Sequence, residues 1–219
     1  MRLFIFIYLL ALICYLFTRT SDNIRYRAIN KYIMATMYLV LAIIVFFQKY
    51  TFTSYQTLLM AALFFAWLGD VFLVFDFGRG GDFFLAGNVC FTMYEQAVML
   101  DHGKQLKDFA WVFVVVALML GVFIWACQKK PEQFKLGKMR WPMTFYLSSI
   151  FTHGITGLAM VLLLPGTNYV TMGIGSVLFM ISDIILTTYR FVVGPKKWLV
   201  RANSLTYFPG LLLIVLGTL

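Results

Sequence analysis

Acidic residues inside long apolar stretches are the residues of this sequence best suited to chemistry. Asp70, Asp183 and Glu95 each lie within a stretch that reads as a membrane-spanning helix. An ionised side chain in hydrocarbon costs at least about 2.5–3.5 kcal/mol on insertion scales, so such residues usually serve a function. Two carboxyls held together in a low-dielectric cavity do not both ionise readily, and one keeps its proton while the other is charged. Such a pair can donate one proton and accept another within a single reaction.

The positions of the two aspartates predict a similar depth in the membrane. Asp70 stands about five residues before the end of its predicted helix, and Asp183 about eight before the end of its own, or roughly 8 and 12 Å at about 1.5 Å per residue. Both helix ends are expected on the same side. The alternative to an acid–base pair is a pair of interhelical hydrogen bonds that only fix helix packing.

Further polar side chains recur at helical spacing near these acids. On each of three predicted helices these polar side chains fall on one face. That face cannot be turned toward lipid, because hydrocarbon offers no hydrogen-bond partner to a polar group. We therefore expect them to line one pocket together with the aspartates. The expected substrate-binding or supporting residues are Glu95, Tyr94, Tyr146, His153, Asn203 and Tyr207.

His153 is the one histidine within a predicted span, and it has two interpretations. It is either a packing residue with a satisfied ring or a partner for a carboxylate or a phosphate headgroup. A catalytic zinc ion usually needs about three protein ligands. The cysteines, Cys14, Cys90 and Cys127, lie singly in apolar stretches and offer no ligand spacing. We expect no metal site and no cofactor.

The composition indicates which elements must position these residues. The chain has 219 residues, of which 62% are hydrophobic and 12% charged, whereas soluble domains are about 25% charged. This excludes a soluble enzyme domain and a nucleic-acid-binding module. A helical span needs about 20 apolar residues, so an all-α membrane protein with about eight transmembrane helices is predicted, as one domain over residues 1–219. The expected segments are 3–18, 29–48, 55–75, 83–100, 108–127, 141–164, 168–191 and 198–219, with a flexible turn over 76–82.

The basic residues predict an orientation. Eight spans place most of the 18 lysines and arginines on one side, including the group Arg19, Arg25, Arg27 and Lys31. Basic loops stay in the cytoplasm. We therefore expect a multi-pass protein of the cell membrane, embedded in the lipid bilayer, with both termini outside the cytoplasm.

An internal repeat is also predicted. When the chain is shifted so that Asp70 falls on Asp183, Leu68–Leu73 aligns with Ile181–Leu186 and Tyr94 falls on Tyr207. The predicted unit is four helices in parallel duplication, with halves of about 1–105 and 106–219. Repeats of this kind often place the working site where the halves meet.

Four segments together resemble the YhhN family, which includes the animal lysoplasmalogenases. They are LGDVFL at 68–73, FLAG at 84–87 with Phe91, FMISDIIL at 179–186 and TYFP at 206–209. The resemblance covers the chain from about residue 55 onward. This sequence departs from the family at Glu95, where a histidine is often found, and near Leu211, where a glutamine is usual.

The resemblance implies a membrane hydrolase that opens the vinyl ether bond of a lysophospholipid, the lysoplasmalogen. Fatty aldehyde and a glycerophospho-alcohol would be the products, and Asp70 and Asp183 would be the catalytic pair. Vinyl ether opening needs one group to protonate carbon and another to stabilise the cation or accept a proton from water. Two other functions remain open: a proton-coupled small-molecule transporter, and a non-catalytic lipid-binding membrane protein.

Overall fold

The computed structural model describes residues 2–48, 55–134 and 136–219, and within them the chain is all-α. Each of the eight predicted apolar segments coincides with a long helix, and a four-residue helix, α5, is added. The helices are α1 (Arg2–Thr18), α2 (Ile24–Gln48), α3 (Gln56–Phe72), α4 (Phe77–Asp101), α5 (Leu106–Phe109), α6 (Trp111–Lys129), α7 (Arg140–Leu163), α8 (Tyr169–Phe191) and α9 (Lys197–Leu216).

The prediction of a flexible turn over 76–82 is wrong. Helix α4 begins at Phe77 because the Asp76 side chain accepts hydrogen bonds from the backbone N–H groups of Gly78 (2.8 Å) and Arg79 (3.3 Å). These are amide groups that a helix start leaves without intrahelical partners. Helix α2 also begins earlier than predicted, and Asn23 Oδ1 accepts from the Tyr26 N–H in its first turn.

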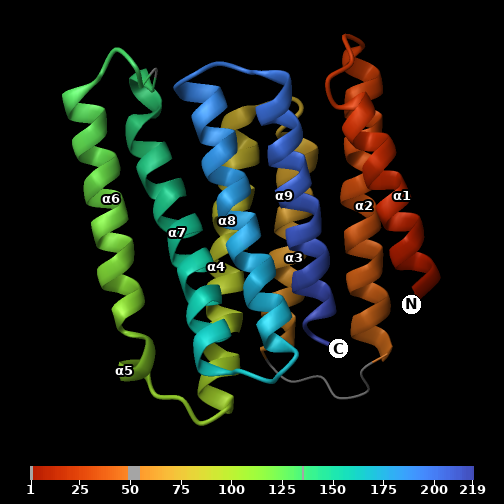
Figure 1. The fold of residues 1–219 in the computed structure, drawn as a ribbon, viewed down its shortest axis with the longest axis vertical. Coiled ribbons are helices and arrows are strands. Elements are labelled where there is room, and N and C mark those ends of the chain that lie inside the picture. The colour runs from red at the N-terminus through yellow and green to blue at the C-terminus, as the bar shows by residue number, and fades with distance from the viewer. Residues whose placement is uncertain (1, 49–54, 135) are drawn as a thin grey trace.

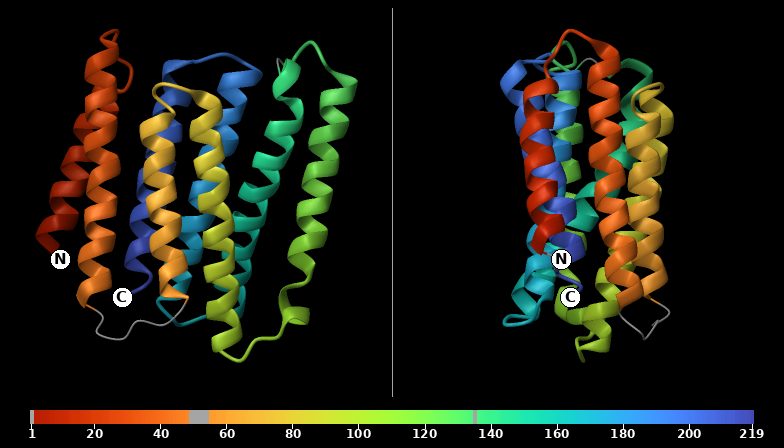
Figure 2. Two further views of the ribbon diagram at one scale, coloured as in Figure 1. Left: turned by 180° about the vertical axis from the view of Figure 1, so that it is seen from behind. Right: turned by 90° about the vertical axis from the view of Figure 1, so that its right-hand side faces the viewer.

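The long helices pack side by side, with their axes roughly aligned. Figure 1 shows α8 and α9 in front of α3 and α4, with α6 at one edge and α1 at the other. The loops from α1 to α2, from α6 to α7 and from α8 to α9 lie at one end, whereas both termini point toward the other. The loop from α3 to α4 lies at the same end as the first three (Figure 2). The loops predicted to be cytoplasmic are therefore together.

Small residues bring α8 close to its two neighbours. A Cβ atom added at Gly175 would lie 2.5 Å from the backbone oxygen of Gly210 on α9. One added at Gly157 on α7 would lie 2.5 Å from the Cβ of Ser176. Small residues allow this approach of helix backbones, which is typical of helix packing in membranes. The packing holds α8, and with it Asp183, firmly between α7 and α9.

The surface is suited to lipid. Five segments within the described residues are long and apolar enough to cross a membrane: Ile24–Gln48, Leu106–Lys129, Gly137–Leu163, Tyr169–Phe191 and Lys197–Leu216. Helices α1 and α3 are apolar but shorter. Large apolar side chains are exposed on many helices, Trp125 at 60% and Phe145 at 67% among them. The chain is a helical membrane protein with several candidate spans.

Candidate active site

Two buried aspartates line one small cavity. Asp70 on α3 is 1% exposed and Asp183 on α8 is 3% exposed. Both line a cavity of about 30 Å³, which has room for about two water molecules. Asn203 and Tyr207 of α9 also line it. Asn203 donates two hydrogen bonds of 2.9 Å to Ser182, one to the backbone oxygen and one to Oγ, which links α9 to the residue before Asp183.

Asp70 is surrounded by donors from two other helices. The Nζ atom of Lys31 on α2 lies 3.1 Å from its Oδ1. Its Oδ2 accepts hydrogen bonds from the hydroxyls of Tyr207 (2.7 Å) and Tyr38 (3.3 Å). A buried ion pair is favourable only when hydrogen bonds satisfy its remaining polar atoms. Both oxygens of Asp70 meet this condition, so the site is built to hold a carboxylate.

Asp183 has a different environment. Its Oδ2 accepts a hydrogen bond from the Tyr146 hydroxyl of α7 at 3.1 Å. Within the described part of the chain, no Lys or Arg lies within salt-bridge distance of it, and no hydrogen bond joins it to Asp70. The two acids therefore share a cavity without sharing a hydrogen bond. Asp70 is paired with the Lys31 ammonium group, and Asp183 accepts a hydrogen bond from the Tyr146 hydroxyl.

Comparison with known proteins decides the family. The family model described as YhhN matches residues 29–218. The chain belongs to the YhhN family. No curated protein and no solved structure gives a match. The matched residues include both aspartates and the three side chains that contact Asp70 in this YhhN protein.

Glu95 and His153 form a second buried cluster in this YhhN protein. Both side chains are fully buried, and His153 Nε2 lies 3.4 Å from Glu95 Oε1. The same carboxyl oxygen accepts a hydrogen bond of 2.6 Å from Ser176 Oγ. The His153 ring stacks on Phe91, with a centroid distance of 4.7 Å and an interplanar angle of 8°.

The expectation that Glu95 and His153 line the pocket of the aspartates is not met, because an aromatic residue fills the space between. The Phe179 ring lies 5.5 Å from His153 on one side and 5.2 Å from Tyr207 on the other, centroid to centroid. Helical spacing indicates which face a residue occupies but not its depth. Glu95 lies toward the end of α4 at Asp101, while Asp70 lies toward the end of α3 at Phe72, on the opposite side.

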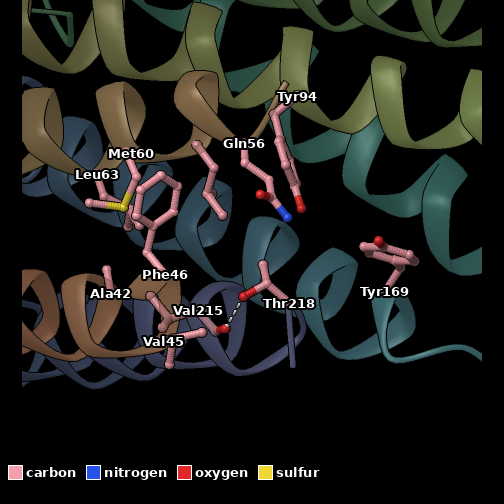
Figure 3. Close-up of a pocket in the computed structure, with 11 residues that line it drawn as sticks. Ala42, Val45, Phe46, Gln56, Met60, Leu63, Tyr94, Tyr169, Val215 and Thr218 are labelled. Carbon is pink, nitrogen blue, oxygen red and sulfur yellow. Dashed lines mark hydrogen bonds between the residues drawn. The ribbon is translucent and has the colours of Figure 1, made fainter. Parts of the chain in front are cut away.

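Tyr94 also lies away from the aspartates. It lines a pocket of about 30 Å³ toward the end of the molecule where the termini lie. Figure 3 shows it beside Gln56, with Tyr169 and Thr218 on the far side of the same pocket. Of the supporting residues expected from sequence, Asn203 and Tyr207 line the aspartate cavity, and Tyr146 donates a hydrogen bond to Asp183 from the helix beside it. Tyr94, Glu95 and His153 do not line this cavity.

Sequence reasoning missed two residues of the cavity region. The charge pattern groups Lys31 with the basic loop residues, but it is 8% exposed and lies inside α2. Tyr38 was not singled out. A signal was present, because Lys31 falls inside an apolar stretch and Tyr38 follows it by two helical turns, on the same face. A lone lysine within a span needs an acidic partner, and Asp70 is that partner.

The Glu95–His153 pair predicts a measurable coupling. Both side chains are fully buried, and removing one of two buried polar partners leaves the other unpaired at a cost of about 1–3 kcal/mol, whereas replacing both by apolar residues costs far less. Glu95→Leu and His153→Leu should each lower the free energy of unfolding, and the double variant should be less destabilised than their sum by about 2 kcal/mol. Denaturant titration in detergent measures this.

The exposed pair Arg79–Asp76, with 3.6 Å between Nε and Oδ2, is the matched control. Its coupling should stay below about 1 kcal/mol. If the changes in the free energy of unfolding caused by Glu95→Leu and His153→Leu simply added in the double variant, this would contradict an interaction between the two residues.

Proposed function

We propose that this YhhN family protein is a membrane hydrolase that opens the vinyl ether bond of lysoplasmalogens. The products are a fatty aldehyde and a glycerophospho-alcohol. One observation carries the proposal: two buried aspartates line one cavity, and one of them is paired with a cation while the other is not. The family includes lysoplasmalogenases, which supports the same conclusion.

The different partners of Asp70 and Asp183 indicate which of them is the acid and which is the base. Asp183, which has no cation beside it, donates its proton to the vinyl carbon and produces an oxocarbenium-like cation. Asp70, charged beside Lys31, stabilises this cation and accepts a proton from the water that adds to it. The resulting hemiacetal then breaks its bond to the glycerol oxygen. That oxygen takes the proton held by Asp70, and the hemiacetal hydroxyl returns one to Asp183, so one water is consumed.

The proposed topology has eight spans, with both termini outside the cytoplasm and residues 1–219 as one domain. Helices α1 and α3 have 17 residues each, which is the lower limit of about 17–25 for a span. The proposed duplication is supported by matching neighbours. In the proposed repeat, α2 corresponds to α7 and α4 corresponds to α9. Helix α2 packs on α9, and α7 packs on α4, so each contact is the counterpart of the other.

Purified protein in detergent provides the direct test. A hydrolase releases fatty aldehyde from a lysoplasmalogen without a sealed compartment, and mass spectrometry detects both products. The second candidate, a proton-coupled transporter, is favoured by the additional buried pair of Glu95 and His153. A transporter is inactive in detergent but moves its substrate into sealed vesicles. Absence of aldehyde from well-folded protein would reject the hydrolase.

A groove beside the cavity is suited to the hydrocarbon chain. It has a volume of about 450 Å³, within the usual range for ligand sites. Its walls come from α4 and α7, and Leu85, Met143 and Phe145 make it largely apolar. Leu73 and Leu186 line both this groove and the aspartate cavity. A chain lying in the groove would direct the ether bond toward the carboxyls.

Filling this groove should weaken catalysis. Gly81 lines it, and a Cβ added there meets no atom within 4 Å, so Gly81→Leu should fit without strain. If the new side chain displaces about two methylene groups of the substrate chain from the groove, about 1.6 kcal/mol of binding free energy is lost. This loss lowers kcat/KM for long-chain substrate by roughly tenfold. A short-chain substrate should be affected less. Steady-state kinetics on the two substrates measures the difference.

Gly121→Leu is the control for this variant. It also adds a Cβ into open space, but on α6, away from the groove. Equal effects of the two variants on long-chain substrate would remove the groove from the proposal.

A further inference from the structure

A second pocket adjoins the aspartate cavity and is strongly basic. It has a volume of about 340 Å³ and is lined by Arg19, Arg27, Lys31 and Arg190. These residues come from the end of α1, the start of α2 and the end of α8. Among the described residues that line it, none is acidic. Lys31 is paired with Asp70, but the three arginines around the pocket repel one another, and a bound anion would offset that repulsion.

Two of these cations are available to a ligand. Lys31 is paired with Asp70, and the Nε of Arg19 donates to Ser204 Oγ at 3.3 Å. Neither Arg27 nor Arg190 has a carboxylate within 4 Å among the described residues. Arg190 lies over the Phe77 ring, 5.1 Å from its centroid, which holds its position. Arginine binds phosphate oxygens through two parallel N–H bonds.

The pocket is continuous with the rest of the proposed site. Arg19, Lys31 and Leu73 line both the basic pocket and the aspartate cavity. Leu73 also lines the apolar groove, so a single side chain borders all three spaces. The basic pocket and the apolar groove both adjoin the aspartate cavity. A ligand that matches this arrangement has an anionic group at one end and a hydrocarbon chain at the other. Free phosphate would use only the basic pocket.

We propose that the basic pocket binds the phosphodiester of a single-chain phospholipid, with Arg27 and Arg190 as its ligands. This inference rests on the proposed function and names its headgroup subsite. With the phosphate beside Arg27 and the chain in the groove, the linkage between them lies next to Asp70 and Asp183. Arg19 and Arg27 precede the residues matched by the family, so the pocket includes a part of the chain that the family comparison does not cover.

Binding of a lipid that cannot react separates this inference from the proposed function. A 1-O-alkyl lysophosphatidylethanolamine has a saturated ether in place of the vinyl ether, and 1-O-alkylglycerol lacks the phosphate. Calorimetry on full-length protein in detergent gives the dissociation constant of each. Arg27→Gln should raise the dissociation constant of the phospholipid about tenfold and leave that of the alkylglycerol unchanged. Arg190→Gln, at an exposed position, should have the same selectivity.

Arg25→Gln is the matched control, because Arg25 is exposed on the same helix and does not line the pocket. It should change neither dissociation constant. Equal effects of Arg25→Gln and Arg27→Gln, or equal effects of Arg27→Gln on both lipids, would overturn the inference. Displacement of the phospholipid by millimolar inorganic phosphate would assign the pocket to free phosphate instead. Selective weakening by Arg27→Gln in a protein that releases no aldehyde would keep the subsite and reject the hydrolase.

Discussion

Asp183→Asn is expected to lower aldehyde release by about 10²–10⁴-fold while the protein keeps its fold. The amide cannot donate a proton to carbon, and the contribution of a positioned acid lies in this range. The Tyr146 hydroxyl, which donates to Asp183 Oδ2 at 3.1 Å, can donate equally to the amide oxygen. The hydrogen bond between α7 and α8 is therefore kept. Turnover of a lysoplasmalogen, with unfolding followed in parallel, measures both quantities.

Asp22→Asn is the control for Asp183→Asn. Asp22 is exposed in the loop between α1 and α2 and has no contact with the cavity. Its replacement should leave turnover at the wild-type rate. If Asp183→Asn retained most of its activity, Asp183 would be a packing residue and the acid–base pair would be wrong. This result would favour the non-catalytic lipid-binding function.

Lys31→Met is expected to destabilise the protein strongly. It leaves the carboxylate of Asp70, 1% exposed, without the cation that lies 3.1 Å away. Loss of one partner from a buried ion pair costs about 3–5 kcal/mol. Lys31→Met combined with Asp70→Asn should recover most of this stability, because Tyr38 and Tyr207 can still donate to an amide oxygen. Denaturant titration in detergent gives the three free energies of unfolding.

The activity of the same variants separates structure from chemistry. The stable double variant should release no aldehyde, because Asp70 is needed as a carboxylate in the proposed reaction. Lys130→Met, at an exposed lysine, is the control and should change neither property. A double variant no more stable than Lys31→Met alone would contradict the assigned ion pair. An active double variant would contradict the role of Asp70.

The positions of the helices followed from the apolar stretches along the sequence. The expected segment 141–164 coincides with α7, Arg140–Leu163, and 168–191 with α8, Tyr169–Phe191. Long apolar stretches identify such helices because each must satisfy its own backbone hydrogen bonds in lipid. The errors lay at helix starts. A flexible turn over 76–82 is the sequence prediction, yet the Asp76 carboxylate caps α4.

What the sequence determined by itself was the kind of protein, its family and which residues are costly to bury. Asp70, Asp183 and Glu95 stand out because a charged group in an apolar helix has no local partner. Only the tertiary structure decided which partner each one has. Lys31 reaches Asp70, and His153 reaches Glu95, because packing fixes the depth and rotation of each helix against its neighbours. Helical periodicity specifies a face and not a depth, so one expected pocket became two buried clusters with Phe179 between them.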